Sequence, residues 1–407
     1  MSKNWTYKRV DRCRLCGSSE IKTVMNFGET ALANSYLSSE DLLKYELTVP
    51  LECFICRCGS FQLGHTVNPE ILFSNYLYES STSASFRSHF EEYAKDIESF
   101  LSDKDDYVID VGSNDGILLK PLKKLGYKIL GIEPAKNLAD KCNKEKIPTI
   151  NKFLDSESVS GALKFMGKKA KAISCNNCFA HIDDLHSVVD NVKALLEDDG
   201  VFIFEVTYLL RNIINNYFDM QYHEHIFTHS VKPLKNFFEL KEMNLFRVKE
   251  VGTHGGSIRC YVKKNCARQK TESSVQDLIN AEENLEIYNY NAFRVWNSRI
   301  AEFKEKLNNK IIYHLNKREE IWAYGCPAKL TTLFKVMGLN GNVIKAVVDD
   351  SPLKQGKFTP DTRIPIVSKE DFKKTNPKVC LISAWNFAPQ IKESNKWYKG
   401  TWIHPFE

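Results

Sequence analysis

Residues 218–229 hold the densest set of proton-transferring side chains in this 407-residue chain. Three of its histidines lie there, together with Tyr222 and Glu224. A histidine exchanges a proton near neutral pH, a carboxylate can orient it, and a tyrosine hydroxyl can hydrogen-bond a developing negative charge. The stretch therefore predicts general acid–base catalysis with His225 as the base, and the alternative is a polar loop with satisfied histidines. A zinc hydrolase is disfavoured because no histidine follows Glu224 at the HExxH spacing.

Two groups of cysteines near the N-terminus have the pattern of a metal site. Cys13 and Cys16 form a CxxC pair, and Cys53, Cys56 and Cys58 follow in one short run. Cysteines in a chain without a secretion signal stay reduced, so such a cluster is better interpreted as metal ligands than as disulfides. Four thiolates close a tetrahedral zinc site, which predicts a structural zinc ion. In the second group of cysteines Cys58 is the favoured ligand, and Cys56, or alternatively Cys53, completes the four ligands.

A strand, a tight turn and a helix are predicted over residues 107–125, as in α/β nucleotide-binding folds. The turn reads DVGSNDG from Asp110, and the next predicted strand ends at Glu133, where such folds bind ribose hydroxyls. The turn lacks a full GxGxxG, so S-adenosylmethionine, which has an adenosine and no phosphate, fits better than a dinucleotide. The alternative is an ordinary strand–turn–helix. The predicted cofactor contacts are Asp110, Gly112, Asn114, Asp115, Glu133 and Asn177.

Groups elsewhere would suit a substrate. Tyr76 and Tyr78 open a hydroxyl-rich segment that would bind a polyhydroxylated ligand or, equally, cap the next helix. His181 lies beyond a predicted strand, where α/β sheets collect functional side chains. Gly325 and Lys329 begin a helix and suit an anionic group such as a diphosphate, and the alternative is a structural glycine with a solvent-facing lysine.

The elements that must position these groups alternate between strands and helices, which predicts an α/β fold class. A length of 407 residues with 43% hydrophobic residues allows two or three globular units. We expect an N-terminal zinc-binding module (1–75), a central class I Rossmann-like methyltransferase domain (76–265) and a C-terminal Rossmann-like α/β substrate-binding domain with a leading helix (266–407).

Charge and hydropathy narrow the classes of function. The 56 basic and 51 acidic residues are interspersed, which argues against a dedicated nucleic-acid binder despite the net charge of +5. The N-terminus has no signal-peptide core, and no stretch of about 18 apolar residues occurs. We therefore expect a cytoplasmic protein with no membrane segment.

The chain resembles the sugar C-methyltransferases that act on nucleotide-linked deoxysugars, the family of the tetronitrose C-3-methyltransferase. The likeness covers essentially the whole chain, and a series of motifs in one order is more specific than any single motif. The motifs are CRxCG from Cys13, CGxxQL from Cys58, Asn114-Asp115-Gly116, Tyr222-x-Glu224-His225, His254-Gly255-Gly256-Ser257-x-Arg259, Tyr324-Gly325-x-x-Ala328-Lys329 and Ala384-Trp385-Asn386.

The resemblance implies that the middle domain binds S-adenosylmethionine and that a nucleotide-diphosphate sugar lies between the middle and C-terminal domains. It implies that His225 removes the proton α to a 4-keto group, at C3, and that the resulting carbanion attacks the methyl group. Tyr222, Tyr76 or Tyr78, and His181 would stabilise the enolate. The implied substrate contacts are His254, Arg259, Tyr324, Lys329 and Asn386. We expect a monomer or weak dimer.

The favoured function is therefore C-methylation of a 4-keto deoxysugar for a branched sugar or a surface glycan. The runner-up is O- or N-methyl transfer to a sugar nucleotide, which needs a base beside a hydroxyl or amine and no enolate-stabilising groups. A zinc-dependent RNA methyltransferase is disfavoured by the even charge distribution. A noncatalytic scaffold is disfavoured by the intact Tyr222–Glu224–His225 set.

Overall fold

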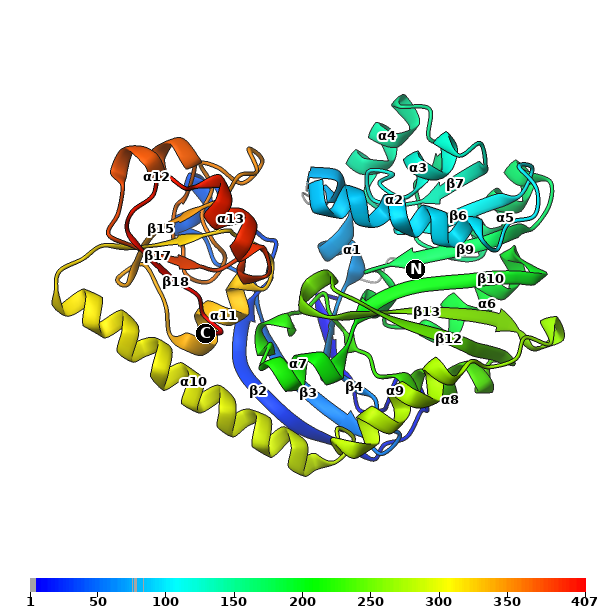
Figure 1. The fold of residues 1–407 in the computed structure, drawn as a ribbon, viewed down its shortest axis with the longest axis horizontal. Coiled ribbons are helices and arrows are strands. Elements are labelled where there is room, and N and C mark those ends of the chain that lie inside the picture. The colour runs from blue at the N-terminus through cyan, green and yellow to red at the C-terminus, as the bar shows by residue number, and fades with distance from the viewer. Residues whose placement is uncertain (1–4, 75, 77–78, 83) are drawn as a thin grey trace.

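The computed structural model describes residues 5–407 apart from residues 75, 77–78 and 83, and it has the predicted α/β class (Figure 1). Its strands form a seven-stranded central sheet, a four-stranded N-terminal sheet, a five-stranded C-terminal sheet and a two-stranded ribbon of β1 (Tyr7–Arg9) and β5 (His65–Val67). The predicted zinc module, Rossmann-like methyltransferase domain and C-terminal α/β domain are all present.

The central sheet has the order β12-β13-β10-β9-β6-β7-β8, with β13 antiparallel to both of its neighbours. The chain runs outward from β6 to β7 and β8 and then returns to the opposite side of β6 at β9. The carboxyl ends of β6 and β9 therefore meet where the strand order reverses, which is where open α/β sheets bind ligands. The strands are β6 (Tyr107–Val111), β7 (Lys128–Ile132), β8 (Thr149–Ile150), β9 (Ala170–Asn176), β10 (Leu196–Thr207), β12 (Met243–Val251) and β13 (Ser257–Lys264).

Helices cover both faces of this sheet, because successive side chains of a strand point to opposite sides. Val108 packs in one cluster with Tyr93 of α2, whereas its neighbour Ile109 belongs to the cluster that contains Val188 of α6. Helices α2 and α3 contact each other, as do α5 and α6. The helices of this domain are α2 (Ala84–Glu98), α3 (Leu119–Lys124), α4 (Lys136–Lys144), α5 (Ser156–Met166), α6 (Leu185–Leu195), α7 (Leu209–Asn215) and α8 (Val231–Leu240).

The N-terminal sheet has the order β11-β4-β3-β2 and takes one strand from the middle of the chain. Its strands are β2 (Ile21–Ala31), β3 (Thr48–Cys56), β4 (Phe61–Leu63) and β11 (Phe227–Thr228). The long hairpin of β2 and β3 runs from the methyltransferase domain toward the C-terminal domain, where α11 (Leu330–Met337) lies against β2 (Figure 1). The zinc module thus contacts both of the other domains and connects them.

The C-terminal sheet is parallel, with the order β16-β15-β14-β17-β18. The long helix α10 (Tyr290–Asn316) leads into it, whereas α9 (Ser273–Asn284) packs on β12 and α8 of the central domain. The remaining elements are α1 (Pro69–Phe73), β14 (Ile321–Tyr324), β15 (Ile344–Val348), β16 (Ile366–Val367), α12 (Lys369–Thr375), β17 (Val379–Ile382), α13 (Ala388–Ser394) and β18 (Thr401–Ile403). No helix among the described residues is long and apolar enough to span a membrane.

One hydrophobic cluster runs through all three modules, with members such as Phe61, Phe204 and Leu333. Phe61 of the N-terminal sheet stacks on Phe293 of α10, with ring centroids 5.2 Å apart. Because the modules share this core, the groups at their junction are held by packing from several sides.

Candidate active site

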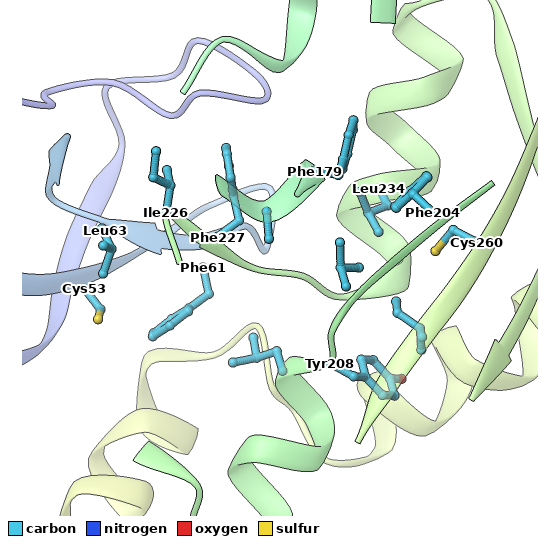
Figure 2. Close-up of a cluster of buried hydrophobic side chains, with 14 of the residues drawn as sticks. Cys53, Phe61, Leu63, Phe179, Phe204, Tyr208, Ile226, Phe227, Leu234 and Cys260 are labelled. Atoms are coloured by element: carbon cyan, nitrogen blue, oxygen red, sulfur yellow. The ribbon is translucent and has the colours of Figure 1, made fainter. Parts of the chain in front are cut away.

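The predicted zinc ligands come together in the N-terminal module. The Sγ atoms of Cys13, Cys16, Cys56 and Cys58 all lie within 4.8 Å of one another, which fits one tetrahedral ion. The Cys58 thiol hydrogen-bonds to Cys13 and lowers the pKa of Cys13 to about 4, so a thiolate is favoured there. Cys53, the alternative ligand, instead lies buried among Phe61 and Leu63 (Figure 2).

The zinc knuckle is fastened to the methyltransferase domain by a buried ion pair. Arg14, between the first two ligands, donates its Nε–H to Asp183 at 2.7 Å, and the arginine side chain is 4% exposed. This pair, with Lys8 and Thr66, holds the pKa of Asp183 at about 2 against the penalty of burial. Since Asp183 follows His181 closely, the zinc module fixes the loop that carries this predicted catalytic residue.

The turn after β6 forms a narrow cradle for a cofactor. Gly112 has φ +68°, and a Cβ there would lie 2.7 Å from the sulfur of Cys178, so only glycine fits. Asn114 is also left-handed, and its backbone N–H donates to Glu133 Oε2 at 2.8 Å. The predicted contacts Gly112, Asn114 and Glu133 thus meet at the carboxyl ends of β6 and β7.

Polar groups at this cradle are left for a ligand to satisfy. Asp115 Oδ1 and both polar atoms of the Asn176 side chain are buried and have no hydrogen-bond partner among the described residues. Such groups cost free energy unless a ligand or water pairs with them. Asn177 follows in the left-handed conformation, whereas the buried Asp110 carboxyl bonds to Ser174 at 2.6 Å and ties β6 to β9. The residues fit the polar adenosine and amino-acid ends of S-adenosylmethionine.

His225 is held in one tautomer. Its Nδ1 lies 2.8 Å from the carbonyl oxygen of Met220, which can only accept, so Nδ1 carries the proton. Nε2 is then unprotonated and accepts a hydrogen bond from the Tyr222 hydroxyl at 2.6 Å. Burial, then the neighbouring His181, lower the pKa of His225 well below its usual value. The ring is therefore neutral at physiological pH and able to accept a proton.

The loop of His225 is anchored by the two residues that follow it. Ile226 and Phe227 lie in the hydrophobic cluster with Phe61 and Leu63 of β4 (Figure 2). The Leu63 N–H donates to the Ile226 carbonyl at 2.8 Å, and β11 pairs with β4. His225 is thus positioned by the N-terminal sheet as well as by its own domain.

Glu224 points to the other side of the same loop. Its carboxyl accepts hydrogen bonds from Asn34 Nδ2 at 2.5 Å and from the Tyr76 hydroxyl at 2.8 Å. Burial raises the pKa of Glu224 to about 7. The carboxyl therefore holds Tyr76 against the loop of residues 221–226, named the base loop after the predicted base His225.

His181 and His254 complete the group of histidines around His225. The His181 ring lies 5.1 Å from that of His225, between centroids, and stacks on Phe73 at 5.8 Å. Its Nε2 is buried and has no partner within the described part of the chain. His254 is in the left-handed loop before Gly255, and burial lowers the pKa of His254 to about 3, with smaller contributions from His225 and Lys329. All three rings belong to one site.

The C-terminal domain contributes Lys329 and Asn386 to this site. The Lys329 Nζ donates to Asn386 Oδ1 at 2.6 Å and lies 3.5 Å from the ring centroid of Trp385. Trp385 packs against Gly255, where a Cβ would lie 2.6 Å from its ring. The glycine pair of the HGGS motif therefore allows the two domains to approach closely.

Comparison with known proteins shows the family. Three family models match: a zinc binding domain over residues 13–73, a methyltransferase domain over 85–244 and a C-methyltransferase C-terminal domain over 252–406. The C-methyltransferase NovU of Streptomyces niveus is 32% identical over 389 residues, which cover 95% of this chain and 92% of that protein. The chain belongs to the C-methyltransferase family.

Two other matches to this C-methyltransferase cover less than half of it. A ubiquinone biosynthesis O-methyltransferase of Actinobacillus pleuropneumoniae is 30% identical over 24% of this chain and 44% of its own. Magnesium protoporphyrin IX methyltransferase of Synechocystis, solved with bound SAH, is 11% identical over 44% of this chain and 83% of that one, with a TM-score of 0.35. The predicted cofactors, S-adenosylmethionine and structural zinc, agree with the methyltransferase and zinc binding domain models and with the four-cysteine cluster.

Some predicted site residues of the C-methyltransferase lie apart from the base. Arg259 is 3% exposed and is paired with Glu205 and Asp96, with its guanidinium 3.8 Å above the Tyr93 ring. Tyr324 is buried in the core of the C-terminal sheet, where its hydroxyl donates to Asp350. Both are engaged within the fold, so their direct contact with substrate stays a prediction. Tyr78 lies outside the described residues.

Several neighbours of the site carry no sequence motif of their own. Asn34 and Tyr36 reach it from the N-terminal module, Asp219 accepts from the Trp385 indole at 2.6 Å, and Asn176 adds its unsatisfied amide. Asp219 lies within the histidine-rich stretch and Asn176 beside the predicted Asn177. Nothing local marks Asn34, because its partner Glu224 is 190 residues away.

Proposed function

We propose that this C-methyltransferase methylates carbon C3 of a nucleotide-linked 4-keto deoxysugar in the cytoplasm, for a branched sugar or surface glycan. The observation that carries the proposal is the fixed tautomer of His225, whose unprotonated Nε2 faces the Tyr222 hydroxyl inside a buried site. A proton beside a ketone is acidic enough for such a base, because the carbonyl oxygen takes up the charge.

Neighbouring groups support this assignment of the base. The Met220 carbonyl fixes the ring orientation, and the pKa of His225 is lowered first by burial, which keeps the ring neutral before reaction. The Tyr222 hydroxyl and the unpartnered His181 Nε2 can hydrogen-bond the sugar as charge develops on it. The Tyr76 hydroxyl, held by Glu224, is directed to the same loop.

The cofactor domain lies next to this base. S-adenosylmethionine supplies an electrophilic methyl group on a positively charged sulfur. Glu133, Asn114, Asp115 and Asn177 would hold it at the β6–β9 switch point, with Asp110 behind them. His181 lies only a few residues beyond Asn177, so a short segment joins the cofactor cradle to the base.

The substrate side is formed by a different domain. Lys329 and Asn386 come from the C-terminal domain and His254 from the loop that packs against it. A sugar nucleotide bound between the two domains would place its ring at the three histidines, with the nucleotide in the C-terminal domain. Arg259 and Tyr324 would then act from behind, through Glu205 and Asp350.

The test is hydrogen exchange in D2O. The enzyme is given thymidine-, uridine-, cytidine- and guanosine-diphosphate 4-keto-6-deoxyhexoses without methyl donor, and deuterium at C3 is followed by NMR. We expect exchange with one of them, and a gain of one methyl group on carbon when S-adenosylmethionine is added. The variant His225→Asn should lose both. His314→Asn, at the end of α10 beside Glu319, is the matched control and should keep both.

The outcomes separate the alternatives. Methyl transfer to an oxygen or nitrogen without C3 exchange would replace the proposal with O- or N-methylation. Full exchange by His225→Asn would remove this histidine as the base. Methylation of RNA and none of the sugars would overturn the substrate class.

A further inference from the structure

Lys329 is a buried amine with no carboxylate at ion-pair distance among the described residues. Burial lowers the pKa of its ammonium to about 7, and the neighbouring Asp219 opposes this shift. The Lys329 side chain is 6% exposed, and its Nζ has one hydrogen bond, to Asn386 Oδ1 at 2.6 Å, among the described residues. The Trp385 ring faces the ammonium, with the centroid 3.5 Å away. An ammonium has three donors, and a ring face stabilises its positive charge without removing it. Lys329 therefore has capacity for another acceptor.

The ammonium acts on the rings of the catalytic site. Burial is the main cause of the low pKa of His225 and of His254, and the positive charge of Lys329 lowers the pKa of both further. The start of α11 is docked on the base loop, because the Thr332 hydroxyl donates to the Gln221 carbonyl at 2.6 Å. Lys329 is thus fixed beside the reacting part of the site.

The surroundings do not suit a diphosphate. Asp219 is wholly buried near the ammonium, and its Oδ1 is unpaired among the described residues. A diphosphate carries two or more negative charges, which this carboxylate would repel in a low-dielectric site. A threonine hydroxyl at the start of a helix could donate a hydrogen bond to a phosphate, but the Thr332 hydroxyl already donates to the Gln221 carbonyl. A single negative charge that forms only during the reaction is repelled less by Asp219 than a diphosphate is, and it depends less on the Thr332 hydroxyl as a second donor.

We infer that the Lys329 ammonium pairs with the 4-oxygen of the sugar and offsets the negative charge that forms there when His225 removes the C3 proton. This inference rests on the proposed function. In this step Nε2 of His225 forms a bond to the proton, and the C3–H electron pair becomes the C3–C4 double bond. The C4–O π electrons move to oxygen, which Lys329 stabilises. The electrons return when C3 forms its bond to the methyl carbon, and sulfur leaves with its bonding pair.

Trp385 and Asn386 act as positioning residues for this cation. The Trp385 indole N–H donates to Asp219 Oδ2 at 2.6 Å, and its ring stacks on Tyr217 at a centroid distance of 4.1 Å. The side chain of Lys329 is therefore held by Asn386 and Trp385 of its own domain, and Trp385 is in turn held by Asp219 and Tyr217 of the methyltransferase domain.

The test compares Lys329→Met, which keeps the length of the chain and removes the charge, with Lys329→Arg, which keeps the charge. The substrate is the 4-keto sugar nucleotide that the wild type exchanges. We expect Lys329→Met to lower C3 exchange at saturating substrate about 100- to 1,000-fold, the usual effect of removing one oxyanion-stabilising group. Affinity for the free nucleoside diphosphate, by calorimetry, should stay within about twofold. The arginine variant should keep more exchange than the methionine variant.

A second readout is the pH profile. Loss of the cation raises the pKa of His225, so the acid limb of the exchange profile should move to higher pH in Lys329→Met. Nucleoside-diphosphate affinity that falls tenfold or more while saturated exchange is unchanged would assign Lys329 to the diphosphate and overturn the inference. Equal exchange in wild type and variant would also overturn it. If Lys329→Met does not fold, Asn386→Leu, which keeps the charge but removes the acceptor that positions Nζ, should lower saturated exchange and leave nucleoside-diphosphate affinity within about twofold. Absence of exchange in the wild type would refute the proposed function itself.

Discussion

The ion pair between Arg14 and Asp183 should stabilise the segment that carries His181, and the size of this stabilisation follows from the structure. The pKa of Asp183 is about 2 against a reference value of 3.8, and the side chain is 28% exposed. At 1.36 kcal/mol for each pKa unit, the ionised form is favoured in the folded chain by about 2.4 kcal/mol. Burial opposes this shift, and Arg14 is the largest cause in its favour. The stabilisation is present above pH 4 and is lost as the pH falls toward 2.

The perturbation is Asp183→Asn. This substitution removes the carboxylate whose ionisation stabilises the folded chain, and it leaves the Arg14 guanidinium, 4% exposed, without its charge partner. Breaking one side of a buried pair costs about 3–5 kcal/mol, so we expect a loss in this range at pH 7.5. Urea unfolding with zinc buffered would measure it. C3 exchange should also fall, because Asp183 fixes the segment of His181.

A double-mutant cycle with Arg14→Met tests the reasoning. The two single variants should each lose stability, and the double variant should be more stable than their sum predicts by at least about 2 kcal/mol. Losses that add to within about 0.5 kcal/mol would refute the pairing. Normal exchange in Asp183→Asn would refute the link from the zinc module to His181.

Three further predictions follow from the site. Cys16→Ser should lose bound zinc and melt at a lower temperature, whereas Cys53→Ser should keep one zinc ion per chain by metal analysis, and loss of zinc in both would reopen the ligand set. Gly255→Ala should lose about 2–4 kcal/mol of stability, because the new Cβ adds left-handed backbone strain and a clash with Trp385. The control Gly28→Ala is also left-handed but has nothing within 4 Å, so it should lose only the backbone strain of about 1–2 kcal/mol. Equal losses in the two variants would contradict the close approach of Gly255 to Trp385. Burial raises the pKa of the Glu224 carboxyl to about 7 from 4.5, so this group destabilises the fold as the pH rises through that interval. The variant Glu224→Gln should therefore be more stable than the wild type by up to about 3 kcal/mol at pH 8 and by little at pH 4.5. A gain in stability that does not grow with pH would refute the pKa shift.

Local patterns were sufficient for part of this protein. The turn from Asp110 to Gly116 could be predicted because glycine conformation, a strand and a helix are all encoded within a few residues. The cysteine pairs predicted a metal site, but they could not choose between Cys53 and Cys56. That choice depends on which way each side chain of β3 points, and the register of β3 with β4 directs Cys53 toward Leu63.

Long-range packing accounts for what the sequence could not reveal. Arg259 stands in a motif with His254, yet alternation along β13 directs it to Glu205 and Asp96 inside the domain. The hydrogen bond between Asn34 and Glu224 joins residues 190 positions apart, and only the position of the β2–β3 hairpin brings them together. The solvent-facing alternative for Lys329 is wrong for a related reason, because the base loop and Trp385 cover it.

The surroundings of the proposed base, His225, are therefore formed by three modules rather than by one motif. The N-terminal module supplies Asn34 and the strand that anchors Ile226 and Phe227, the central domain supplies His181, and the C-terminal domain supplies Lys329. Each contact buries a polar or charged group that is costly to leave unpaired, so the site favours the docked arrangement of all three. A chain that lost the contact between its domains would keep its cofactor cradle at β6 and β9 but would lose the position of Lys329 beside His225 and the support for Glu224. Cofactor binding and proton abstraction should accordingly be separable, with mutations at the domain junction affecting only the second.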